Sequence, residues 1–130
     1  MKKVFTAMAI MALMLLVWYI SQPGYGSKLS FEGTDVYYTE EVTEEEAQRL
    51  GEYLVQTGFA DGREKSVQLT KRDSVYLFRM VVMEGVTKDS TNDLTFEAMA
   101  VTLSYNAFNK APVQLEACDN RFNTLRVYGR

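Results

Sequence analysis

Five carboxylates that lie close together in the chain are the side chains best placed to do chemistry. They are Glu40, Glu41, Glu44, Glu45 and Glu46. A carboxylate cluster can hold a cation, but a calcium loop needs ligands at alternating positions and a glycine at its bend. This run has neither feature. Three of the acids follow Thr43, where carboxylates stabilise the positive end of a helix dipole. We therefore interpret the cluster as the acidic start of a helix.

Cys118 is the only cysteine, and the chain has no histidine at all. A catalytic thiol needs a base or a lowered pKa, and histidine is the most common general base. We therefore expect Cys118 to be a structural thiol, with an intermolecular disulfide as the alternative. The sequence contains no phosphate-binding loop, serine-nucleophile motif or metal-spaced ligand set. No catalytic residue, cofactor or metal is predicted.

Two tyrosines on predicted strands are the candidates for binding a partner. Tyr76 and Tyr128 each alternate with apolar residues that we assign to the core, such as Leu77 and Val127. This parity predicts that both tyrosines lie on a sheet face that no helix covers. A protein partner could dock there by face packing or by strand addition. The alternative is that both rings only cover the sheet, with their hydroxyls reaching water.

Arg79 is the one charged residue in the apolar run 75–83. Apolar residues occupy both parities of this run, which is typical of a central strand. A half-buried arginine needs an acidic partner, because an unpaired charge is costly to bury. We therefore expect a carboxylate beside Arg79.

Two helices are predicted from capping residues and apolar spacing. Thr43 and Glu46 form a capping box at the start of the first, which should end at Gly58. Ser90 is the expected cap of the second, which should run to about Phe108. Its inner face is predicted from residues at helical spacing, namely Leu94, Ala98, Val101, Tyr105 and Phe108. Four further apolar residues are expected to widen this face: Phe96, Met99, Ala100 and Leu103.

Six strands are predicted at residues 28–32, 35–39, 66–70, 75–83, 113–117 and 124–128. Gly33 and Thr34 should form a type II′ turn between the first two. The order is β-β-α-β-β-α-β-β, and the expected fold is α+β, with an antiparallel-rich sheet of about six strands and both helices on one face. The triplet Val-Gln-Leu occurs at 67–69 and again at 113–115. This repetition indicates either an internal duplication or a chance match.

The first twenty residues predict a membrane helix. Lys2 and Lys3 precede an apolar run at residues 4–20, which would rise about 25 Å as a helix. Positive flanks stay in the cytoplasm, and Trp18 and Tyr19 suit the far membrane interface. We expect a signal anchor at 1–20, a spacer at 21–27, and an extracytoplasmic domain at 28–130.

A cleaved signal peptide is the alternative to this anchor. Gly24 and Gly26 form a small-x-small pair that would allow cleavage before Ser27 and release a secreted protein. The apolar run is long for a signal peptide and ends in bulky residues, which favours retention of the anchor.

The charge balance restricts the partners. The whole chain has a formal net charge of −3, and without Lys2 and Lys3 the exported part holds 12 Lys and Arg against 17 Asp and Glu. An acidic domain is a poor ligand for nucleic acid or an anionic lipid surface. The remaining length is enough for one domain.

The stretch 36–127 resembles a family of uncharacterised bacterial domains, which are usually small and often membrane-anchored. The positions that carry the likeness include Val36-Tyr37-Tyr38, Gly58-Phe59, Val67-Gln68-Leu69, Pro112-Val113 and Cys118-Asp119. These look like core and turn positions, so the resemblance implies a fold and assigns no activity. The sequence favours a non-catalytic interaction module, accessory to an envelope assembly. A hydrolase that uses carboxylates is the alternative.

Overall fold

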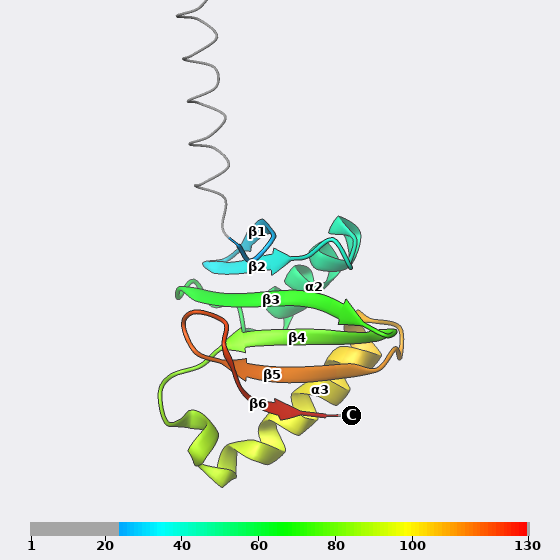
Figure 1. Cartoon of the computed structure of the whole chain (residues 1–130). Helices are drawn as coiled ribbons and strands as arrows, with labels where there is room; N and C mark the ends of the chain where they lie inside the picture. The colour runs from blue at the N-terminus through cyan, green and yellow to red at the C-terminus, as the bar shows by residue number, and fades with distance from the viewer. Residues whose placement is uncertain (1–23, 130) are drawn as a thin grey trace, which may run out of the picture.

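Residues 24–129, which the computed structural model describes, form a six-stranded sheet with two α-helices behind it (Figure 1). Among these residues no helix is long and apolar enough to span a bilayer. The membrane helix predicted at residues 1–20 lies outside the described part. The elements in chain order are β1 (Ser27–Phe31), β2 (Thr34–Tyr38), α2 (Glu44–Gln56), β3 (Lys65–Arg72), β4 (Val75–Val81), the 3-10 turns η1 (Val86–Lys88) and η2 (Ser90–Asn92), α3 (Asp93–Ala107), β5 (Val113–Cys118) and β6 (Thr124–Tyr128).

The strands lie in the sheet in the same order as in the sequence. The three hairpins, β1–β2, β3–β4 and β5–β6, are antiparallel. The pairs β2–β3 and β4–β5 are parallel, because a helical crossover returns the chain to the end at which the previous strand began. The predicted α+β class, six strands and element order are confirmed, and the sheet is mixed.

The first hairpin turns one residue earlier than predicted. Phe31 pairs with Thr34, so Glu32 and Gly33 are the two loop residues. Both have positive φ, at 47° and 84°, which is the type I′ geometry rather than type II′. Thr34 is fully buried at the start of β2, which explains why it cannot serve as a loop residue.

Helix α2 begins and ends where its capping residues predict. The Thr43 side chain accepts a hydrogen bond from the Glu46 backbone N–H, and the Glu46 side chain accepts one from the Thr43 N–H. After the helix Gly58 has a φ of +82° and bonds back to the Val55 carbonyl. The capping box and the glycine stop are both confirmed.

Gly51 sets how closely α2 approaches the edge of the sheet. A Cβ at this position would lie 2.1 Å from the Phe31 ring of β1. The missing side chain therefore leaves the space that the Phe31 ring occupies.

Helix α3 differs from its prediction in both its cap and its inner face. Ser90 opens a 3-10 turn capped by the Asp89 side chain, and α3 itself starts at Asp93. The buried residues of α3 are Ala100, Leu103 and Ala107. The predicted inner face is right at Ala100, Leu103 and Phe108, which are buried. It is wrong at four positions that are exposed, namely Leu94, Ala98, Val101 and Tyr105.

The core lies between the helices and one face of the sheet. Val36, Val67, Phe78, Leu115 and Tyr128 contribute to it from five neighbouring strands. The two Val-Gln-Leu triplets occupy equivalent places, each on the strand that follows a helix and pairs in parallel with the strand before that helix. In both, the valine and leucine are buried.

Candidate functional site

Three residues of the acidic cluster form the first turn of α2, where one of them caps the helix. Glu44, Glu45 and Glu46 lie in its first turn, and Glu46 also accepts a hydrogen bond from the Tyr76 hydroxyl. Partial burial acts to raise the pKa of Glu46, but the hydrogen bonds from Tyr76 and Thr43 outweigh it and lower that pKa. Within residues 24–129 no three His, Cys, Asp or Glu side chains are arranged to hold a metal ion.

Tyr76 lies under the helices and not on the open face of the sheet. Its ring stacks on Phe108 at 4.4 Å between centroids, next to α3. Burial, followed by the hydrogen bond to Glu46, raises the pKa of Tyr76 to about 12. The predicted exposure of Tyr76 is therefore wrong, because its neighbour Phe78 shares its parity and faces the core.

Tyr128 is also on the helix side, with only 1% of its surface exposed. Its ring lies 5.0 Å from the Phe96 ring of α3, between centroids. On the opposite parity β6 exposes Leu125 and Val127, which the sequence had assigned to the core. The predicted placement of Tyr128 is wrong because the parity of Tyr128, and not that of Val127, faces the core. Neither tyrosine has the exposure on which the docking hypothesis was based.

The open face of the sheet carries a polar cluster centred on Arg79. Gln68, Arg79 and Glu116 are directly opposite one another on β3, β4 and β5. The Arg79 Nε donates to Glu116 Oε1 at 2.9 Å, and its other nitrogens donate to Gln68, to the Phe122 carbonyl and to Thr124. The acidic partner predicted for Arg79 is thus Glu116.

An aromatic cover lies over part of this cluster. Tyr25, just before β1, packs edge-on against Phe122 of the β5–β6 turn at 4.8 Å and against Tyr37 of β2 at 5.6 Å. The Gln68 side chain donates to the Tyr25 carbonyl at 2.8 Å. The folded part therefore begins inside the predicted spacer. The cluster is satisfied internally and offers no free acid or base.

Cys118 is fully buried at the end of β5. Burial raises the pKa of its thiol, and the nearby Arg79 opposes that shift only in part. A buried thiol with a raised pKa is a poor nucleophile. This environment fits the structural role expected from the sequence.

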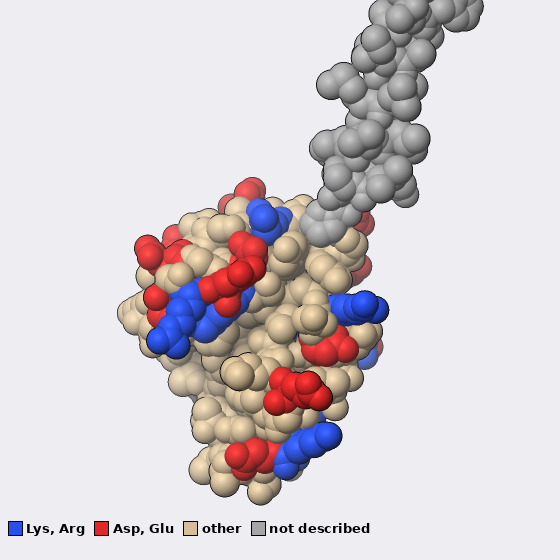
Figure 2. Space-filling model, turned by 90° about the vertical axis from the view of Figure 1, so that its left-hand side faces the viewer, with Lys and Arg blue, Asp and Glu red and all other residues tan. Residues whose placement is uncertain are grey.

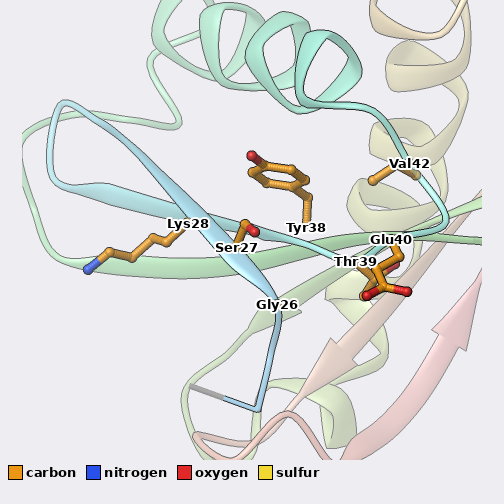
Figure 3. A pocket seen from close by; sticks show the side chains of 7 residues that line it. All are labelled: Gly26, Ser27, Lys28, Tyr38, Thr39, Glu40 and Val42. Atoms are coloured by element: carbon orange, nitrogen blue, oxygen red, sulfur yellow. The ribbon is translucent and has the colours of Figure 1, made fainter. Parts of the chain in front are cut away.

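A surface hollow of about 590 Å³ lies beside the start of β1. Figure 3 shows its lining, in which Tyr38 points toward α2 while Lys28 and Glu40 lie at opposite ends. Its two charged side chains do not converge on a common point. The hollow therefore lacks the polar grouping that would orient a small molecule.

The outer face of α3 is the most unusual surface of the described residues. Leu94, Val101 and Tyr105 are 79%, 56% and 62% exposed, and Ala98 lies exposed between them. We call these four residues the α3 ridge. The sequence analysis grouped these four residues but assigned them to the inner face. That assignment failed because α3 is apolar on two opposite sides, and the other side faces the core. A helix that is apolar all round is normally buried.

Charges do not form an extended area of one sign on the side of the molecule that Figure 2 shows. Acidic and basic side chains lie next to one another there, with uncharged surface between them. Ion pairs between described residues include Lys65–Asp61 and Arg126–Asp93, at 2.6 and 3.0 Å between nitrogen and oxygen.

Residues 28–129 match the AF_1994_N family, whose description is an N-terminal domain, and the chain belongs to this family. The match spans every strand and helix except the first residue of β1. It is an uncharacterised family, as the resemblance implied. No curated protein and no solved structure matches the chain.

Proposed function

We propose that the protein is a membrane-tethered, non-catalytic interaction module whose domain lies outside the cytoplasm and binds a protein through the α3 ridge. The observation that carries the proposal is the exposure of Leu94, Val101 and Tyr105 on one side of one helix. Contiguous apolar surface of this kind marks an interaction site in a soluble domain. The ridge also lies on the side of α3 opposite its buried residues, so a partner can reach it without unfolding the core.

Two features support a tether. The apolar run at 4–20 follows Lys2 and Lys3, which is the arrangement of an anchor with its start in the cytoplasm. Cleavage before Ser27 would remove Tyr25, whose ring and carbonyl hold the aromatic cover and Gln68. Loss of these contacts would cost a secreted form stability, which favours the uncleaved protein.

A binding role is better supported than hydrolysis by carboxylates. A hydrolase that uses carboxylates, as a glycosidase does, needs two acids that face one reacting bond. Glu116 is the one buried acid among the described residues, and it is paired with Arg79. Asp61 and Asp93 pair with basic side chains, and Glu46 caps a helix. The acids that the fold positions are thus engaged in structural contacts.

Photo-crosslinking in intact cells tests this function. A photoreactive benzoylphenylalanine is placed at Val101, and as a matched control at Asn120, an exposed residue of the β5–β6 turn far from the ridge in sequence. We expect position 101 to give a protein adduct on irradiation and position 120 to give none. If position 101 yields only lipid adducts or no adduct, the ridge does not bind a protein and the proposal fails.

A further inference from the structure

The α3 ridge has the spacing of a coiled-coil seam. Leu94, Ala98, Val101 and Tyr105 follow one another at intervals of four, three and four residues. This alternation keeps the side chains on one narrow stripe and is the a/d pattern through which two helices interdigitate. The residues that flank the stripe are Thr95 and Thr102 on one side and Glu97 and Ser104 on the other. A seam of this kind is complementary to another helix.

Shallow grooves run along both sides of the ridge and provide the holes for such packing. The groove between α2 and α3 has a volume of about 280 Å³ and is lined in part by Tyr53, Thr95 and Thr102. The groove between α3 and the sheet has a volume of about 350 Å³ and is lined in part by Ser104 and Pro112. A ridge between two grooves is the shape that a second such ridge can pack against.

We propose that the occupant of the ridge is α3 of a second copy of this chain, packed antiparallel; this inference rests on the proposed function and names its partner. In an antiparallel seam each a residue meets a d residue of the other helix. Leu94 then meets Tyr105 at both ends, and Ala98 meets Val101 twice in the middle. The packing is symmetric, with a large Leu94–Tyr105 layer at each end and a smaller Ala98–Val101 layer on each side of the two-fold axis. A parallel seam would instead pair Ala98 with itself and leave a gap between larger layers.

The charges along α3 also favour the antiparallel arrangement. The helix carries Asp93 and Glu97 in its first half and no charged residue in its second half. A parallel copy would bring the acid-bearing halves of both helices to the same end of the seam and would align the two helix dipoles. An antiparallel copy places Glu97 near Ser104 and opposes the dipoles, which is the better electrostatic match. Asp93 is already paired with Arg126, and Glu97 accepts the Gly129 N–H at 2.8 Å.

The place where the chain enters the domain agrees with this symmetry. The described part begins at Gly24, three residues before β1, and β1 is the sheet edge far from α3 (Figure 1). Helix α3 runs obliquely across the back of the sheet, and its ridge faces away from the sheet. The two-fold axis of an antiparallel pair is perpendicular to both helices and to the line that joins them. It therefore lies parallel to the sheet and points roughly toward that edge. Two antiparallel copies therefore receive their N-terminal segments from the same side, as two anchors in one membrane require. A copy related by an axis along α3 would receive its segment from the other side.

Disulfide formation between two tagged full-length chains tests the arrangement. One chain carries Leu94→Cys and the other Tyr105→Cys, and both are expressed together and oxidised in membranes. A disulfide needs Cα atoms within about 7 Å, and antiparallel packing brings residues 94 and 105 of different copies together. Two copies of residue 94 would then be about 16 Å apart along the helix. We expect a linked product that carries both tags, and little product when Leu94→Cys is expressed alone.

The controls are the unaltered chain, whose only thiol is the buried Cys118, and a pair in which both chains carry Asn120→Cys. Neither should be linked. A Val101→Asp substitution added to the 94–105 pair should abolish the product, whereas Asn120→Asp should not. Linkage of residue 94 to itself would overturn the antiparallel arrangement, and linkage of no pair would overturn the second copy as partner. If residue 101 still photo-crosslinks to a different protein in that case, the proposed function stands and only this inference fails.

Discussion

Replacement of Arg79 by methionine should be one of the most damaging single changes in the described domain. The substitution keeps most of the apolar stem and removes every donor of the guanidinium. Glu116 then loses its ion pair and keeps only the 2.9 Å hydrogen bond from the Thr124 hydroxyl. Its side chain is 8% exposed, so water can replace only a small part of what is lost.

The expected cost follows from this geometry. Removal of one partner of a buried ion pair costs about 3–5 kcal/mol, because the other charge stays buried without compensation. The Arg79 side chain is 18% exposed, so water reaches part of the site. We therefore expect a cost at the lower end of this range, about 3 kcal/mol. A domain of this size has about 5–15 kcal/mol of stability. At about 4–8 °C per kcal/mol, the melting temperature should fall by roughly 15 °C.

Urea and thermal unfolding followed by circular dichroism measure this cost. The double variant Arg79→Met with Glu116→Leu removes both charges and should recover part of the loss, since the desolvation penalty of Glu116 disappears. Glu64→Gln, an exposed carboxylate on the segment before β3, is the control and should change stability by less than about 0.5 kcal/mol. The reasoning is refuted if Arg79→Met costs less than about 1 kcal/mol, or if the double variant is no more stable than the single one.

Four further predictions concern the cap, the pH dependence and the leader. Thr43→Ala should cost about 1 kcal/mol in urea unfolding, because two backbone N–H groups lose their reciprocal cap. The pKa of Glu46 is lower in the folded than in the unfolded chain, so its ionisation stabilises the fold above the unfolded pKa. This stability is lost as the pH falls through the folded pKa. Glu46→Gln should therefore flatten the acid side of a plot of unfolding free energy against pH. Tyr76, with its pKa raised to about 12, should add stability that is lost as the pH rises from about 10 to 12, and Tyr76→Phe should remove that fall. N-terminal sequencing of the protein from cells and medium together should find no chain that begins at Ser27; if most of the protein begins there, the anchor is wrong.

Local signals in the sequence predicted the local structure well. The capping box at Thr43 and the glycine stop at Gly58 depend only on neighbouring residues, and both are as predicted. The acidic partner of Arg79 was predictable as a residue type but not as Glu116. Its identity depends on the parallel register of β4 and β5, which distant parts of the chain determine.

The sequence could not tell which side of a doubly apolar element faces the core. Helix α3 offers large residues on one side and Ala100, Leu103 and Ala107 on the other. The side with the alanines faces the core, because small side chains allow the helix to pack close to the sheet. The larger residues are left on the outer side. Strand β4 poses the same problem, since Leu77 and Phe78 are both buried on opposite faces. This ambiguity reversed the placement of Tyr76 and hid the ridge on which the proposed function rests.

Cysteine labelling in intact spheroplasts tests most directly whether the α3 ridge is covered in the cell. A membrane-impermeant maleimide is applied to full-length chains that carry either Val101→Cys or Asn120→Cys, both at exposed positions of the isolated chain. The account predicts rapid labelling at position 120, because the domain lies outside the cytoplasm, and slow labelling at position 101 until detergent or urea disperses the partner. Equal and rapid labelling at both positions would show that the ridge is bare and would contradict the account.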